Sequence, residues 1–233
     1  MSTTGAARGL FAYDGRLARV LLAVFQCFAT SALFLLTALP AIVVDQASGR
    51  ISHAAIWLGV IAALPIGPGV YAALAGMRGF IAGHGYQGRL FKRFWSDFAT
   101  GTARLRWLWA GAAAIELLLA YNAALYGEGD GAFLAVTAGG VLVATAVVAV
   151  CCIALQGASG RPLEVLTLAL HAAAARPLAP LTWLVVLATA LAATQLPVFG
   201  TNLALFLPAL AAWTVLTANR VTGFDRKAAA LVG

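Results

Sequence analysis

One acidic residue lies near the middle of an apolar stretch that is long enough to cross a membrane. Glu116 occurs within the sequence Ala-Ile-Glu-Leu-Leu of the stretch Trp107–Leu125. An ionisable group in a bilayer is costly unless it is paired, protonated or hydrated, and such groups often belong to ion pathways. Glu116 is therefore a candidate for a proton relay or a cation contact. The structural alternative is a carboxylic acid that a neighbouring helix satisfies, through Gln26, Asn122, Gln195 or a backbone carbonyl.

Two prolines and two glycines interrupt another apolar stretch, Ala54–Met77. They are Pro65, Gly67, Pro68 and Gly69, in the sequence Leu-Pro-Ile-Gly-Pro-Gly-Val. Proline removes a backbone donor and bends or ends a helix. Broken helices near the middle of a membrane often form transporter sites, because the freed backbone groups can bind a ligand. The alternative is a kink that packs closely against a neighbouring helix.

The segment Gln87–Arg106 has the pattern of an amphipathic helix. Lys92 and Arg93 lie among its polar positions. Such a helix can lie flat at an anionic membrane surface, where it could also meet a partner, or it can pack against the underside of a helix bundle. The pattern favours neither placement over the other. Its bulky apolar side chains recur every three or four residues: Leu90, Phe91, Phe94, Trp95 and Phe98.

No set of residues indicates an enzyme. The three histidines show no metal-ligand spacing, and neither a GxSxG nor a Walker A sequence occurs. Cys27, Cys151 and Cys152 all fall in apolar stretches without a CxxC pair, which is typical of buried small apolar side chains. We therefore expect no catalytic residue, no cofactor and no metal.

The composition is that of an integral membrane protein. Of 233 residues, 62% are apolar and 10% charged, against about 45–50% and about 25% in a soluble domain. Each span must be helical, because lipid cannot satisfy backbone polar groups. The predicted fold class is all-α: one polytopic bundle of about six spans with amphipathic helices along one face. The predicted spans are Val20–Val44, Ala54–Met77, Trp107–Leu125, Ala132–Leu155, Leu181–Val198 and Leu203–Asn219.

The positions of Lys and Arg predict the orientation. A six-span topology places 14 of the 15 basic residues on one side and Arg50 alone on the other. Because cytoplasmic loops are enriched in Lys and Arg, both termini and the amphipathic helices are predicted to be cytoplasmic, in a bacterial inner membrane. A five-span topology with Ala54–Met77 as a re-entrant loop would move 11 of these 14 to the opposite side from the N-terminus. No nucleic-acid-binding signature accompanies the net charge of +7, so the expected partner is the lipid bilayer and not nucleic acid.

Three stretches of the chain resemble the YesL-like family of bacterial integral membrane proteins. They are Leu39-Pro40, the sequence from Ile66 to Leu74 with its basic exit at Arg78, and Phe91-Lys-Arg-Phe-Trp-Ser-Asp-Phe98. The family is defined as a domain of unknown function, and its members are often described as accessory proteins near carbohydrate-uptake systems. The stretch Val44–Leu64 departs from many members, which run from Leu-Pro almost directly into the Gly-Pro segment. The resemblance implies an accessory role, with a carbohydrate transport system as the partner.

Two functions follow from these features. The first is a non-catalytic accessory protein that assists carbohydrate uptake through its aromatic and basic cytoplasmic helix. The second is a small secondary transporter or channel that uses Glu116 and the interruption of the second span. A polar cavity lined by Glu116 and open to one side would favour transport. A tightly packed bundle in which a neighbour caps Glu116 would favour the accessory role.

Overall fold

The computed structural model describes residues 16–47, 52–84, 88–126, 130–158, 160–194 and 204–232. All regular elements within these residues are helical, which confirms the predicted all-α fold class. In chain order they are α2 (Arg16–Ala47), α3 (His53–Ala63), α4 (Ile66–Gly79), the short π-helix η1 (Phe80–His84), α5 (Leu90–Arg104), α6 (Arg106–Tyr126), α7 (Asp130–Leu155), α8 (Pro162–Ala175), α9 (Leu178–Thr194), α11 (Leu207–Thr222) and α12 (Phe224–Val232).

Four segments of the described chain are long and apolar enough to cross a membrane: Val20–Ala47, His53–Ala82, Arg106–Tyr126 and Phe133–Leu155. They correspond to the first four predicted spans. A fifth is present if α8 and α9, which meet at a bend of 93°, form one broken span. Helices α9 and α11 have 17 and 16 residues and flank residues 195–203, which lie outside the described part. The fifth and sixth predicted spans therefore stay predictions.

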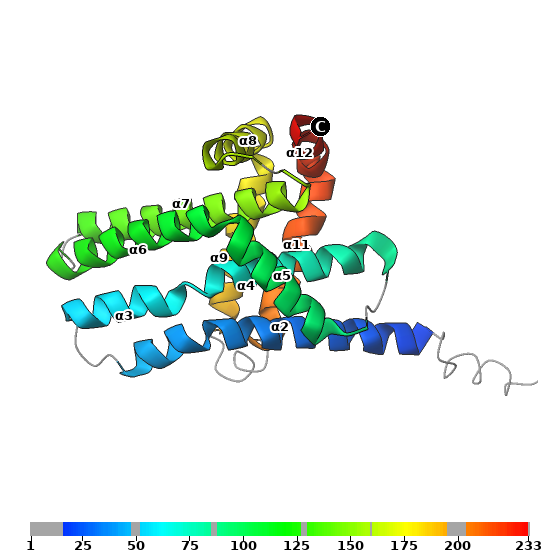
Figure 1. Cartoon of the computed structure of the whole chain (residues 1–233), viewed down its shortest axis with the longest axis horizontal. Coiled ribbons are helices and arrows are strands. Elements are labelled where there is room, and N and C mark those ends of the chain that lie inside the picture. The colour runs from blue at the N-terminus through cyan, green and yellow to red at the C-terminus, as the bar shows by residue number, and fades with distance from the viewer. Residues whose placement is uncertain are drawn as a thin grey trace, which may run out of the picture.

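The long helices share one direction. Figure 1 shows α2, α3, α4, α6 and α7 running along the long axis of the molecule, whereas α9 and α11 run across it. Helix α6 packs beside α7, and α11 contacts α2, α4 and α9. Helices α8 and α12 lie against each other at one side of the bundle. The last helices thus cross the first group, so the bundle is not a simple array of parallel spans.

Local sequence explains where several helices begin and end. The Ser52 hydroxyl caps α3 by accepting a hydrogen bond from the Ala55 amide at 3.1 Å. Helix α8 begins with a proline at Pro162, and the Glu164 carboxylate accepts from the Arg161 amide at 3.1 Å. Gly223 has φ +74°, a left-handed conformation that glycine adopts without strain, and it separates α11 from α12.

The buried core lies around the C-terminal half of α7. Its residues 149–154 are almost fully buried, together with Met77 of α4 and Phe224 of α12. Cys151 and Cys152 belong to this core, whereas Cys27 is half-buried. By contrast, the long helices expose large apolar side chains on the outside of the bundle, which is typical of helices that face lipid.

Candidate functional site

Glu116 is open to the surface of the bundle. Its side chain is exposed, as are the adjacent Ala114 and Ile115. No hydrogen bond or ion pair joins Glu116 to another described residue, and neither of the two cavities described below is lined by it. The described residues thus supply neither a cavity nor a capping group for this carboxyl.

The side chains suggested as partners for Glu116 do not fill that role in the described structure. Gln26 is 1% exposed within α2, and neither of its amide atoms has a hydrogen-bond partner among the described residues. The amide oxygen of Asn122 is also buried without one. Gln195 lies outside the described residues.

The helix break in the second span is short and closely packed. Helix α3 ends at Ala63 and α4 begins at Ile66, with a turn at Leu64 and Pro65 between them. Helical hydrogen bonding resumes at once, because the Gly69 amide donates to the Pro65 carbonyl at 3.1 Å. The break therefore leaves the Pro65 carbonyl bonded within the helix and not free for a ligand.

The glycines after the break bring helices close together. A Cβ at Gly67 would overlap the indole of Trp109 in α6, and a Cβ at Gly69 would overlap Thr37 in α2. Pro68, which stands between these two glycines in the sequence, is also buried. Small residues at such positions let helix backbones approach each other. These contacts support close packing as the role of Pro65, Gly67, Pro68 and Gly69.

Helix α5 is attached to the bundle along one side. Phe94 is 6% exposed, and Gly101 lies against the ring of Tyr71 in α4. The Trp109 indole donates to the Gly101 carbonyl at 3.1 Å. At the end of the helix, Arg104 donates to the Ala158 carbonyl at 2.7 Å. Of the two placements expected for this segment, packing against the bundle is therefore present.

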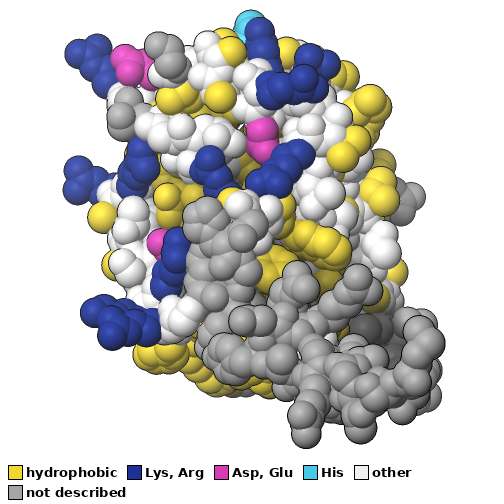
Figure 2. Space-filling model, turned by 90° about the vertical axis from the view of Figure 1, so that its right-hand side faces the viewer, with side chains coloured by type: hydrophobic (Ala, Val, Ile, Leu, Met, Phe, Trp, Pro, Cys, Tyr) yellow, Lys and Arg dark blue, Asp and Glu magenta, His cyan; other side chains and the backbone are white. Residues whose placement is uncertain are grey.

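The other side of α5 is exposed and carries aromatic and basic groups. Phe91 is 64% exposed, and Lys92 and Arg93 are also exposed. Trp95 contacts the rings of Phe91, Phe94 and Phe98 at centroid distances of 6.1, 5.8 and 5.2 Å. Figure 2 looks onto the right-hand end of the molecule as drawn in Figure 1, and Lys and Arg side chains gather there. Packing on the bundle thus leaves an exposed aromatic and basic side that can meet a membrane surface or a partner.

A small cavity lined by both apolar and polar side chains lies beneath α5. It has a volume of about 20 Å³, and its lining includes Gln26, Thr30, Arg93 and Asp97. Burial raises the pKa of the Asp97 carboxyl, and the nearby Arg93 opposes this rise. A cavity of this size with polar groups in its wall holds about one water molecule. Such a water would satisfy the Gln26 amide, which no protein group does among the described residues.

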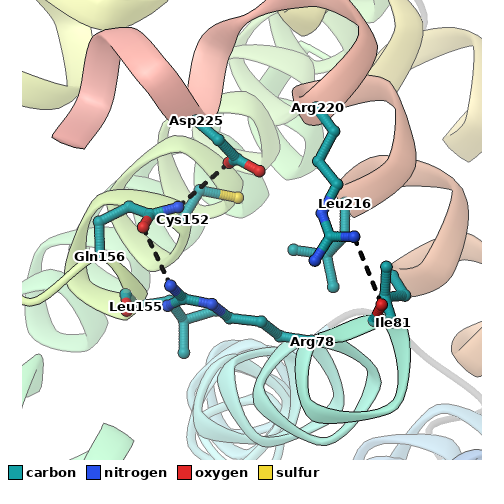
Figure 3. Close-up of a pocket in the computed structure, with 8 residues that line it drawn as sticks. All are labelled: Arg78, Ile81, Cys152, Leu155, Gln156, Leu216, Arg220 and Asp225. Atoms are coloured by element: carbon teal, nitrogen blue, oxygen red, sulfur yellow. Dashed lines mark hydrogen bonds between the residues drawn. The ribbon is translucent and has the colours of Figure 1, made fainter. Parts of the chain in front are cut away.

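A larger polar cavity, of about 160 Å³, lies where α4, α7 and α11 end and α12 begins. Figure 3 shows Arg78 and Arg220 flanking its open centre, with Gln156 and Asp225 along one edge. In the sequence, these arginines are basic residues at the predicted cytoplasmic ends of two spans, and nothing there indicates that they lie together. No sequence motif indicates the cluster, because its members come from three separate parts of the chain, residues 78–81, 152–156 and 216–225.

No family model, curated protein or solved structure matches this chain.

Proposed function

We propose that this protein is a non-catalytic accessory component of a membrane complex, and that it binds a transmembrane helix of its partner at the surface around Glu116. The observation that carries the proposal is the exposure of a carboxyl group near the middle of α6 without a partner among the described residues. An acidic residue at the centre of a membrane helix costs about 2.5–3.5 kcal/mol on insertion scales. A hydrogen-bond donor or a basic group on a second chain removes that cost.

The arrangement of Glu116 differs from that expected of a transporter site. Carboxylates that carry ions or protons face the bundle interior or a water-filled cavity. Glu116 faces the outside, and the helix break in the second span is packed against Trp109 and Thr37. Both features argue against a small secondary transporter or channel. In the accessory role, the partner supplies the cap for Glu116 that no described residue of this chain provides.

The proposed location rests on the distribution of charge, and the proposed partner rests on the family resemblance. Lys and Arg gather on one end of the molecule (Figure 2), which supports a cytoplasmic placement of that end. We place the protein in the bacterial cell membrane with both termini in the cytoplasm. The resemblance to the YesL-like family makes a carbohydrate-uptake system the first partner to test, and the exposed side of α5 offers it a second contact.

The experiment compares partner recovery from native membranes. Affinity-tagged full-length protein is purified in a mild detergent as wild type, Glu116→Gln, Glu116→Leu and Leu125→Ala. Leu125 is exposed on the same helix and serves as a matched control. We expect Glu116→Leu to lower the recovery of a co-purifying membrane protein about tenfold, because its side chain offers no hydrogen-bonding group. Leu125→Ala should leave the recovery unchanged.

Two results would contradict the proposal. One is recovery of the same partners by Glu116→Leu and by the wild type. The other is ion or sugar flux in liposomes containing only the purified protein, when that flux is lost in Glu116→Gln. The second result would establish the transporter alternative.

A further inference from the structure

We propose that the cavity between Arg78 and Arg220 is a binding site for a phosphate group. Its volume of about 160 Å³ far exceeds the about 15 Å³ that one water molecule needs. The site is independent of Glu116, which does not line it. It lies at the end of the molecule where the basic side chains gather (Figure 2).

Both arginines donate hydrogen bonds to other elements of the bundle. Arg78 donates to the Leu155 carbonyl at the end of α7, and its second terminal nitrogen donates to the Gln156 side-chain oxygen at 3.0 Å. Arg220 donates to the Ile81 carbonyl at 3.4 Å. A guanidinium group has five N–H donors, so these bonds occupy only part of each fork. Arg78 is thus oriented by two bonds before a ligand arrives, whereas Arg220 has one longer bond and most of its donors open.

The chemistry of the lining favours an anion. Two guanidinium groups face one carboxylate, Asp225, which gives the cavity a net charge of +1 when Asp225 is ionised. The Asp225 carboxylate already accepts a hydrogen bond from the Gln156 amide at 3.2 Å. Gln156 thereby joins Asp225 to Arg78 on one side of the cavity, while Arg220 flanks the other side (Figure 3).

Phosphate fits this arrangement better than a single carboxylate. Planar guanidinium forks bind phosphate oxygens in pairs, and a tetrahedral phosphate can present separate oxygens to two forks on different helices. The phosphate can belong to a lipid headgroup or to a soluble molecule, because the chemistry recognised is the same. Arg220 is exposed, so a ligand can reach the cavity from outside.

The test measures phosphate binding by the full chain in dodecyl maltoside, a detergent that contains no phosphate. One arm titrates inorganic phosphate, and the other titrates short-chain phosphatidic acid below its micellar concentration. The proteins are wild type, Arg220→Gln, Arg220→Lys and Arg226→Gln. Arg226 is exposed on α12 and does not line the cavity, so its replacement controls for the loss of one charge. Circular dichroism checks the fold of each variant.

We expect saturable binding in at least one arm. Arg220→Gln should weaken it about tenfold, Arg220→Lys should weaken it less, and Arg226→Gln should leave it unchanged. Binding of the lipid alone identifies a headgroup site, and binding of inorganic phosphate identifies a site for soluble ligands; both support the proposal. Absence of saturable binding in both arms, or equal losses in Arg220→Gln and Arg226→Gln, overturns it. If Arg220→Gln does not fold, the comparison of Arg220→Lys with Arg226→Gln decides in the same way.

Discussion

At the scale of single residues, glycine packing tests how the second span is built. Gly67→Ala adds a Cβ that overlaps the Trp109 indole, so the ring or the backbone must move. We expect a loss of about 1–3 kcal/mol in the free energy of unfolding, as for other overpacked sites. The measurement is chemical unfolding in detergent micelles. Gly76→Ala in the same helix is the control, because a Cβ there meets nothing within 4 Å. Equal losses in both variants would show that the contact with Trp109 does not constrain α4.

Asp225 gives a second test at this scale. Burial raises the pKa of its carboxyl, and the charges of Arg78 and Arg220 and the hydrogen bond from Gln156 oppose that rise without cancelling it. A carboxyl with a higher pKa in the folded chain favours folding at low pH, and this contribution is lost as the pH rises through the folded pKa. Ionised Asp225 therefore opposes folding at neutral pH.

Asp225→Asn removes this charge and keeps an acceptor for Gln156. We expect a higher thermal midpoint than wild type at about pH 7, and a difference that shrinks towards about pH 3, where the wild-type carboxyl is mostly protonated in both states. Thermal unfolding at several pH values in this range measures the difference in midpoint between the variant and the wild type. A gain that does not change with pH would mean that the charge of Asp225 is not its cause.

At the scale of elements, the two sides of α5 should differ sharply. Phe94 is buried against the bundle, whereas Phe91 is 64% exposed. Phe94→Ala should lower the free energy of unfolding by about 3–5 kcal/mol, because it leaves a cavity in the packed side. Phe91→Ala should change it by less than about 0.5 kcal/mol, as exposed substitutions do. Unfolding in micelles compares the two, and similar losses would show that α5 does not hold this orientation.

A buried polar chain connects α7, α9 and α11. The Trp183 indole donates to the Asn219 side-chain oxygen at 2.8 Å, and the Asn219 amide donates to the Cys152 sulfur at 3.2 Å. Asn219→Leu leaves the Trp183 N–H buried without this acceptor, at a cost of about 1–3 kcal/mol. Trp183→Phe removes that donor. The double variant should therefore lose less stability than the sum of the two single variants, and strict additivity would contradict the coupling.

At the scale of the whole molecule, the number of crossings decides which side the C-terminus occupies. Cysteine replaces Lys92, Tyr126 or Ala230, one position at a time, in a variant in which alanine has replaced the three native cysteines. With six spans, a membrane-impermeant thiol reagent added to intact cells should label only Tyr126→Cys, and the other two should react after lysis. Labelling of Ala230→Cys in intact cells would indicate five crossings.

Much of the fold could be predicted from local sequence. The lengths of the apolar stretches predicted α6 and α7 to within a few residues of their observed ends. These features suffice because helix formation in lipid is a local requirement of the backbone. The direction of α9 and α11 was not predictable in this way, since it depends on how α11 packs on α2 and α4 and how α9 packs on α11 and α7.

For the candidate sites, too, some features could be predicted from the sequence and others could not. The sequence by itself determined that Glu116 lies near the middle of an apolar helix, that α5 is amphipathic, and that basic residues cluster in particular segments. Only the tertiary structure decided that Glu116 faces outward, that Gly67 and Gly69 pack against Trp109 and Thr37, and that Arg78 and Arg220 flank one cavity. The physical reason is that residue type and spacing determine the free-energy cost of placing a polar group in a membrane helix. The groups that offset this cost come from other helices and depend on how these helices pack.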